Sequence, residues 1–370
     1  MQSTTDKLFM DYADEFLELV LRERRQPNIH LLREVTTRSP FPIPPVLIKD
    51  YRALTVQEKV DISKCYQSLG VTHFVACNAL EHSDESHPLH IIAAQLSESL
   101  QLQHPLRHPL EGHPEAVKRF GPDDATVKIY DLPKQVGGSG YREVAETSDS
   151  FEVHLDGLGS GGTVDSVFLY MDQAPLFGGF TFFYDLLALG IALSCDDMEA
   201  FRHLFLPDAF TAVRPRGKGA IKVVTPVFYI DEAGLPHVFF RKDSGEYRMS
   251  WREGCAPLER ARKFLEQYTK PFANGSYFVP FTRKGCACIS RNRDIAHGRI
   301  GFIDGEEPCQ RRLLSRKWFM TSAKHAIYKH VPGIAVRSDV ASLSADRFGE
   351  PQLEGEWLYN AAEDRNIRLK

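Results

Sequence analysis

Several features that would place this chain in a specialised class are absent from its 370 residues. No run approaches the roughly 20 consecutive apolar residues that a transmembrane helix needs. The N-terminus, MQSTTDKLFMDYADEF, is acidic where a secretory signal peptide has a basic region followed by an apolar one. No internal repeat is visible. These absences predict a globular protein in the cytoplasm.

An excess of charge of one sign is also lacking. The chain has 45 basic and 49 acidic residues, which gives a net charge of -4, and both kinds are spread along its length. Such a balance gives no extended positive potential that would bind nucleic acid or an anionic membrane, so we expect a small-molecule substrate. The 7 cysteines are odd in number and have no CxxC spacing, which predicts free thiols rather than a disulfide framework.

The N-terminal part of the chain predicts helices. Apolar residues recur at helical spacing over 6–25, so this stretch predicts a packing helix. Thr55 with Glu58 is typical of a capping box at the start of a second helix, which Gly70 would end. We expect 1–124 to form a helical and mixed scaffold.

Histidine is concentrated in one region of this scaffold. Six of the 14 histidines fall within it: His82, His87, His90, His104, His108 and His113. Their spacings are irregular, prolines interrupt them and no cysteine completes a zinc set. Loops and a short helix near HIIAAQL are therefore favoured over a metal cluster.

After this region the sequence changes to short apolar segments separated by glycine-rich stretches. Over 125–182 these segments predict β-strands, and one or two helices follow over 185 to about 205. Strand-like segments then resume, and a helix at about 257–269 precedes further strands that end near 320. This order predicts one domain, mainly β with helices (α+β), with a jelly-roll core over 125–320 and an insertion at about 185–275. The C-terminal extension, 321–370, has no assigned fold.

The segment FEVHLDG carries a candidate metal site. On a strand, residues two apart face the same side, so His154 and Asp156 would lie next to each other. An HxD pair is common by chance and needs a third ligand. His297, 143 residues downstream in RNRDIAHGR, would complete two histidines and a carboxylate, the facial set that binds non-haem Fe(II) and leaves three positions open.

Arginines near the end of the core suit a dicarboxylate cosubstrate. The far carboxylate of a molecule such as 2-oxoglutarate needs a bidentate guanidinium. Arg312 and Arg316 are four apart in a strand-like segment and can face the same way, and the Thr181 hydroxyl could add a hydrogen bond. Arg311 competes with Arg312, because a one-residue slip in register reverses the facing.

Four ordered pieces of sequence carry a resemblance to a known family: HLDG, APLFGGFTFFYD, SRNRDIAHGR and RRLLSRKW. Together they resemble the taurine dioxygenase and clavaminate synthase-like Fe(II)/2-oxoglutarate oxygenases over roughly residues 125–320. The resemblance implies a double-stranded β-helix, which is a jelly roll, with a helical insertion. The matching positions are His154, Asp156 and His297 as iron ligands, Thr181 and Arg312 for 2-oxoglutarate, and Arg316 near the substrate.

The resemblance also implies the reaction. Fe(II), 2-oxoglutarate and O2 would support oxidative decarboxylation to succinate and carbon dioxide, coupled most often to hydroxylation of an unactivated C–H bond. A ligand carboxylate such as Asp156 argues against halogenation, whereas desaturation and oxidative cyclisation remain open. The expected substrate is a free amino acid or an amino-acid-derived intermediate, whose carboxylate Arg316 could bind.

Two further segments bear on the substrate. The run GLGSGG at 157–162 departs from the family pattern, and its glycines predict a mobile segment that closes on substrate binding. Acidic residues in the insertion predict a solvated loop or, less simply, a contact to a basic substrate group; they are Asp231, Glu232, Asp243 and Glu246.

Two other classes of function fit part of the pattern. A jelly-roll protein with this triad could bind metal without turnover, or the triad could hold zinc and activate water for hydrolysis. Both alternatives leave the GGxT motif and the arginines without a role.

Overall fold

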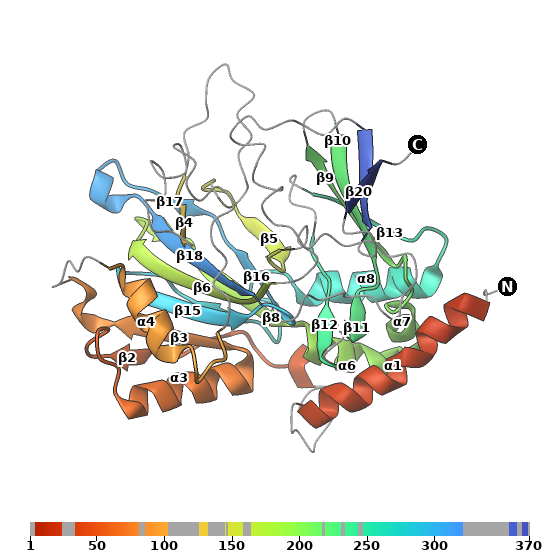
Figure 1. Cartoon of the computed structure of the whole chain (residues 1–370), viewed down its shortest axis with the longest axis horizontal. Coiled ribbons are helices and arrows are strands. Elements are labelled where there is room, and N and C mark those ends of the chain that lie inside the picture. The colour runs from red at the N-terminus through yellow and green to blue at the C-terminus, as the bar shows by residue number, and fades with distance from the viewer. Residues whose placement is uncertain are drawn as a thin grey trace.

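A computed structural model gives the fold of the chain (Figure 1). It describes residues 4–23, 34–80, 86–102, 126–131, 145, 147–157, 164–216, 219–230, 234–242, 247–320, 355–360 and 365–368. This part of the chain is mixed α+β, with most of its elements in sheets. It contains no helix long and apolar enough to span a membrane. All seven cysteines lie within it and are free thiols, as predicted.

Two β-sheets form the centre of the molecule. The six-stranded sheet runs β2 (Val46–Ile48), β3 (Val71–Ala76), β15 (Cys286–Arg291), β6 (Val164–Gln173), β18 (Leu313–Met320) and β4 (Thr126–Ile129). The five-stranded sheet runs β1 (Phe41–Pro42), β14 (Tyr277–Val279), β8 (Thr181–Asp185), β16 (Ile295–Arg299) and β5 (Phe151–His154). Neighbouring strands are antiparallel except where β1 joins β14 and β2 joins β3.

The two sheets share one apolar core. Val167 and Leu169 from β6 belong to the same buried cluster as Phe183 from β8 and Ile295 from β16. Because alternate residues of a strand face opposite sides, each of these strands places one set of side chains in this core and the other set on an outer face. The sheets therefore pack face to face.

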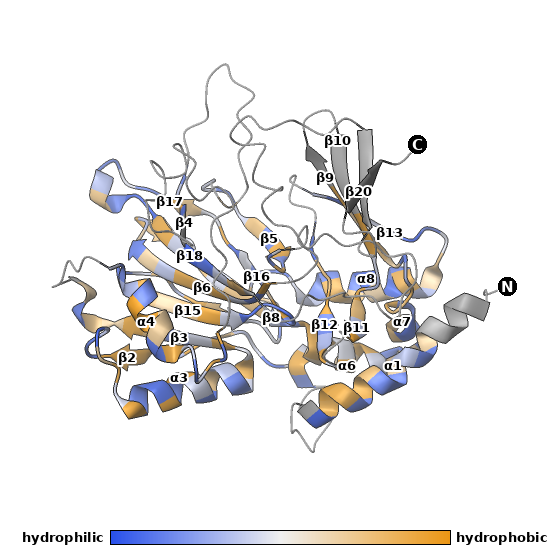
Figure 2. Ribbon diagram, in the orientation of Figure 1, coloured by the Kyte–Doolittle hydropathy of each residue, from blue (hydrophilic) through white to orange (hydrophobic). Residues whose placement is uncertain are grey.

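Helices cover the outer face of the six-stranded sheet. Helix α3 (Val56–Leu69) and helix α4 (Pro88–Leu96) bury apolar residues against it, and Figure 2 shows hydrophobic and hydrophilic residues alternating along α3. The predicted capping box at Thr55 is confirmed, and α3 ends at Gly70 in the left-handed conformation, with φ 71°. Glycine adopts that conformation without steric cost.

A second helical layer covers the five-stranded sheet. It consists of α1 (Thr4–Glu23), α6 (Leu186–Asp196), α7 (Met198–His203) and α8 (Ala256–Tyr268). Their apolar residues share a buried cluster with Val153, Phe182 and Ala296 from the sheet. Four layers result, with the helices outside and the sheets between them (Figure 1).

The remaining strands lie beside this second helical layer. A five-stranded sheet runs β13 (Arg248–Trp251), β9 (Phe210–Arg216), β10 (Gly219–Thr225), β19 (Gly355–Asn360) and β20 (Arg365–Arg368). Two-stranded sheets pair β11 (Phe228–Ile230) with β12 (Pro236–Val238) and β7 (Phe177–Gly178) with β17 (Phe302–Ile303). Between β8 and β14 the chain thus leaves both central sheets and builds a separate helical and β unit.

Two segments supply strands whose pairing the sequence did not predict. The N-terminal scaffold supplies β1, β2 and β3, which extend both central sheets. The C-terminal extension supplies β19, which pairs in parallel with β10. These strands are short or lie far along the chain from their partners, so local patterns gave no sign of their pairing.

The His-rich region contributes to the fold through side-chain contacts. His87 begins α4: its Nδ1 accepts from the Leu89 amide at 3.2 Å, and its Nε2 lies 2.5 Å from Asp172 Oδ1. The Nδ1 of His90 lies 2.8 Å from the Lys317 ammonium. The other four histidines of the region, His82, His104, His108 and His113, lie outside the described residues.

Candidate active site

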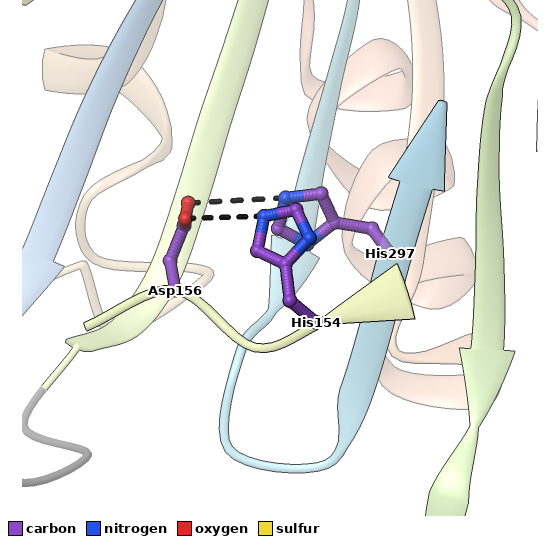
Figure 3. A group of neighbouring side chains, drawn as sticks. All are labelled: His154, Asp156 and His297. Carbon is purple, nitrogen blue, oxygen red and sulfur yellow. Dashed lines mark ion pairs between the residues drawn. The ribbon is translucent and has the colours of Figure 1, made fainter. Parts of the chain in front are cut away.

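The candidate metal site is built where β5 ends against β16. In the antiparallel register of these strands, His154 lies directly opposite His297. Asp156 follows two residues after the last residue of β5, so it reaches the site from a turn rather than from the strand. Both His154 and Asp156 were predicted to lie on a strand. The strand ends at His154, two residues before Asp156, yet both side chains point to the same place (Figure 3).

The three side chains converge in the protein interior. His154 Nε2 lies 3.5 Å from one carboxylate oxygen of Asp156, and His297 Nε2 lies 3.8 Å from the other. One ligand atom from each residue lies within 4.8 Å of the other two, and all three residues are buried. Within the part of the chain that the structure describes, they form the one group of three or more such residues able to hold a metal.

The two imidazoles are set up to offer lone pairs. His154 Nδ1 lies 2.8 Å from the Glu152 carbonyl oxygen, which can only accept, so Nδ1 carries the proton and Nε2 is left basic. His154 Nε2 is buried and has no hydrogen-bond partner within the described part of the chain. Burial, together with the nearby His154, lowers the pKa of His297 to about 3. The His297 ring is therefore neutral at neutral pH, and the contact to Glu152 leaves the Nε2 lone pair of His154 directed at the site.

Two side chains from β18 orient the carboxylate. The Trp318 indole donates to Asp156 Oδ2 at 2.9 Å, and the Arg316 guanidinium approaches Oδ1 at 3.4 Å. Arg316 also lies over the Trp318 ring, 4.4 Å from its centroid. Burial alone would raise the pKa of Asp156, but the charge of Arg316 and contacts with both histidines hold it well below the usual value. Asp156 is thus an anion.

A second feature is a buried arginine next to the start of β18. Arg312 is 2% exposed, and its Nε and Nη1 have no hydrogen-bond partner. Burial first, and then repulsion from Arg299, lower the pKa of Arg312 well below its usual value. A guanidinium stays protonated in proteins, so this lowering measures how poorly its charge is compensated by the described residues. An anion placed against it would be strongly favoured.

The GG pair of the APLFGGFT motif lies against this arginine. A Cβ on Gly179 would lie 3.5 Å from Arg312 Nε, and both glycines have positive φ. A Cβ on Gly178 would come within 2.5 Å of the Gly301 carbonyl oxygen, so only glycine allows β7 and β17 to approach there.

The other predicted site residues lie nearby or at the surface. Thr181 is buried and begins β8, where it pairs with Arg299 two residues beyond His297 along β16. The Arg311 side chain is exposed and donates to the Glu306 carbonyl at 3.3 Å. Arg312 is buried and Arg311 is exposed, and both residues precede β18.

Some residues of the site were not singled out from the sequence as site residues. Trp318 follows Arg316 by two positions on β18, so strand alternation could have found it. Asn292 and Arg299 flank His297 in the sequence, which does not show what they contact. Arg299 donates to the carbonyls of Thr147 and Asp149 at 2.7 and 2.6 Å.

Two predicted features cannot be placed. The GLGSGG run lies outside the described residues except for Gly157, which has φ 73°. The acidic residues of the insertion, Asp231, Glu232, Asp243 and Glu246, also lie outside them.

No family model matches the sequence, and no curated protein matches it. Solved structures do resemble the fold. The non-heme iron oxygenase OrfP in complex with Fe, succinate and (3R,4R)-dihydroxy-L-Arg matches with a TM-score of 0.50 at 14% identity, covering 87% of this chain and 93% of OrfP. Asparagine oxygenase in complex with Fe(II), 2S,3S-3-hydroxyasparagine and succinate matches with a TM-score of 0.48 at 15% identity, covering 86% and 92% of the two chains.

A taurine dioxygenase from Burkholderia xenovorans matches with a TM-score of 0.48 at 17% identity, covering 84% of this chain and 98% of that one. At 14% identity the likeness to OrfP establishes a shared fold and no more. The resemblance that the sequence motifs predicted is confirmed at the level of fold.

Proposed function

We propose that the protein is an Fe(II)- and 2-oxoglutarate-dependent dioxygenase. The observation that carries the proposal is the combination of a buried triad of two imidazoles and a carboxylate with a buried guanidinium whose Nε and Nη1 have no hydrogen-bond partner among the described residues. A metal site alone fits many functions, and so does a buried arginine alone. The two together fit a metal that binds one end of a dicarboxylate whose other end is held by the protein.

The residues present fit an iron centre. His154, Asp156 and His297 would supply two neutral imidazoles and one carboxylate, the set that suits non-haem Fe(II). Burying the Nε2 atom of His154 without a hydrogen bond costs free energy, and a cation bound to that atom would remove the cost. When bound, Fe(II) would supply the oxygen chemistry by which 2-oxoglutarate is decarboxylated and a C–H bond is oxidised.

The protein's own residues would bind and orient the reactants. Arg312 would hold the far carboxylate of 2-oxoglutarate, with the Thr181 hydroxyl as a second donor. Arg311 is a poorer candidate because its side chain faces solvent. Trp318 and Arg316 would keep the Asp156 carboxylate ionised and fixed, and the Glu152 carbonyl would keep the proton of His154 on the nitrogen away from the metal.

The fold proposed for this activity is a double-stranded β-helix formed by the two central sheets, with the segment of about 185–275 as its insertion. Fold likeness to OrfP supports this architecture. We assign the whole chain to one oxygenase domain, with 125–320 carrying the core.

The substrate we propose is a free amino acid or an amino-acid-derived intermediate. Arg316 lies at the metal site with its buried Nε unpaired, so its guanidinium can serve a substrate carboxylate as well as Asp156. Arg241 is buried next to His154 in a β-bridge, and its charge helps to lower the pKa of His297. Two cations beside the triad favour a substrate with an anionic group.

The outcome we propose is hydroxylation, and Asp156 leaves no place for a halide among the ligands. Desaturation and oxidative cyclisation use the same ligands and are the alternative outcomes. Zinc-dependent hydrolysis and metal binding without turnover explain the triad but give Arg312 no function.

The test is formation of succinate. The protein is incubated with Fe(II), ascorbate, 2-oxoglutarate and O2 in the presence of a panel of L-amino acids, each matched with the amine that lacks its carboxylate. We expect succinate to rise above the substrate-free rate for at least one amino acid and not for its matched amine. Absence of 2-oxoglutarate turnover under all conditions, with hydrolysis of an ester by the zinc-loaded protein, would replace this proposal with the hydrolase.

A further inference from the structure

Asn292 makes an unusually complete set of contacts near the metal site. It lies after β15, in the turn that leads into β16, and its side chain is 2% exposed. Its Oδ1 accepts from the Asp156 amide at 2.8 Å, and its Nδ2 donates to the carbonyls of Asp156 and Val164, both at 2.9 Å. Its own amide donates to the Asp165 carbonyl at 2.6 Å. The side-chain amide thus uses its acceptor and both donors.

The turn that presents Asn292 is held on several sides. The Arg291 amide donates to the Gly70 carbonyl at 2.7 Å, and the Arg291 guanidinium forms two 2.7 Å contacts with the Asp294 carboxylate. The Asp294 carbonyl accepts from the Leu186 amide at 3.0 Å. Backbone contacts with Gly70, Asp165 and Leu186, together with the ion pair inside the turn, therefore fix the position of Asn292.

Asp156 needs such support because it lies beyond the end of β5. The ladder between β5 and β16 stops at His154, so no sheet hydrogen bond holds the Asp156 backbone. Both its amide and its carbonyl are instead bonded to Asn292. The carboxylate itself has the Trp318 indole at 2.9 Å and the longer Arg316 contact at 3.4 Å.

We propose that Asn292 is a positioning residue that fixes the backbone of the metal ligand Asp156 and thereby tightens metal binding. The inference rests on the proposed function for its metal, and deepens it. Residues that orient a metal ligand by hydrogen bonding to it, without contacting the metal, typically raise metal affinity about 10- to 100-fold. Asn292 reaches the ligand through the main chain, which separates its effect from that of Trp318 on the carboxylate.

The first experiment measures metal binding without turnover. Co(II) is titrated into the metal-free parent, Asn292→Ala and Asn78→Ala, with the absorption of the bound ion as readout. Asn78 is a matched control: it is buried, accepts from the Tyr51 amide at 3.2 Å and donates to Asp50 at 2.8 Å, away from the triad. We expect Asn292→Ala alone to bind Co(II) about 10- to 100-fold more weakly, with an altered spectrum.

The second experiment measures the backbone directly. In the metal-free proteins, hydrogen exchange of the Asp156 amide should be faster in Asn292→Ala than in the parent and unchanged in Asn78→Ala. If Asn292→Ala does not fold, Asn292→Ser takes its place, because a hydroxyl retains part of the bonding in a smaller side chain. The serine variant should then show the same changes to a smaller degree.

The outcomes separate the two proposals. Parent-like Co(II) affinity, spectrum and Asp156 exchange in the Asn292 variants would overturn the positioning role while leaving the metal centre intact. A parent protein that binds no Co(II) would overturn the metal centre itself and this inference with it.

Discussion

Arg312 is a buried cation whose Nε and Nη1 have no hydrogen-bond partner in the described part of the chain. Its flat face lies over the Phe302 ring, 5.1 Å from the centroid, and Arg299 lies over the same ring at 4.8 Å. An aromatic face offsets part of a cation's burial but supplies no anion. The residue is costly to the fold as it stands, which is expected of a group that binds a ligand.

A substitution pair tests that role. Arg312→Ala should raise the 2-oxoglutarate concentration required for half-maximal succinate formation by about 30-fold or more, because truncating one member of a desolvated charge pair costs about 2–5 kcal/mol. Arg312→Lys should recover little of the lost 2-oxoglutarate affinity, since an ammonium cannot form two parallel hydrogen bonds to a carboxylate. Arg311→Ala is the matched control and should behave like the parent. A large effect of the Arg311 variant with a silent Arg312 variant would contradict the assignment.

The metal ligands allow a similarly controlled test. His154→Ala should abolish turnover and weaken Fe(II) binding by more than about 100-fold. That loss exceeds the one expected for a residue that only supports a ligand, because the substitution removes a proposed ligand itself. His203 is a buried histidine in α7 whose Nδ1 also contacts a backbone carbonyl, that of Glu199, at 2.7 Å. Fe(II) titration of His203→Ala should give parent-like affinity. Equal losses in both variants would point to unfolding rather than ligation.

At the scale of elements, the start of α3 joins helix and sheet. The Thr55 hydroxyl accepts from the Glu58 amide at 3.2 Å, and the Glu58 carboxylate accepts from the amides of Thr55 and Lys49 at 2.7 and 2.8 Å. Lys49 directly follows β2. Burial would raise the pKa of Glu58, but these backbone donors outweigh it and lower the pKa. The capping box therefore also fixes β2 against the helix.

Thr55→Ala should lower the free energy of unfolding by about 1 kcal/mol, the usual cost of removing an N-cap. Thr37→Ala is the control, because the exposed Thr37 hydroxyl donates only to the Glu34 carbonyl at 2.9 Å, and its effect should stay within about 0.5 kcal/mol. Chemical denaturation measures both, and succinate formation should be unchanged in each. An equal decrease in the free energy of unfolding of the two variants would mean that the capping box stabilises the protein no more than an exposed hydroxyl does.

What the sequence could predict also differs by element. The helix cap placed the start of α3 because that signal is local, whereas the register shift between Leu313 and Leu314 interrupts the alternation from which the facing of Arg312 and Arg316 was predicted. Pairing of β1 with β14 or β10 with β19 joins segments more than a hundred residues apart, and short strands carry no mark of their partner. The ordered motifs around His154 and His297 predicted the residues that the structure brings together, while the bonds from Asn292 to Asp156 became visible only in three dimensions.

At the scale of the whole molecule, a buried histidine makes stability depend on pH. His73 on β3 lies between the sheets, and its Nδ1 contacts the Ile43 carbonyl at 2.7 Å. Burial lowers its pKa below the ordinary 6.5, despite that contact. In the unfolded chain His73 takes up a proton as the pH falls through 6.5, whereas in the folded protein it resists, so the stability present above that pH is lost below it.

We therefore expect the free energy of unfolding of the metal-free protein to fall as the pH is lowered below about 6.5, and His73→Leu to show a shallower fall. Denaturation at a series of pH values measures the slope. A slope that is the same in parent and variant would show that other groups account for the acid sensitivity.

The long sequence separations within the site have a consequence for biosynthesis. His154 and His297 are 143 positions apart, and the indole that fixes Asp156 comes 162 residues after it. β18 also fills the place between β6 and β4, so the six-stranded sheet is incomplete until that strand has left the ribosome. A nascent chain therefore cannot assemble the triad, or place Arg312 beside it, early in synthesis. If the proposed function holds, we expect iron to load only after translation has passed Met320, so that the unfinished polypeptide is spared oxygen chemistry at an incomplete centre.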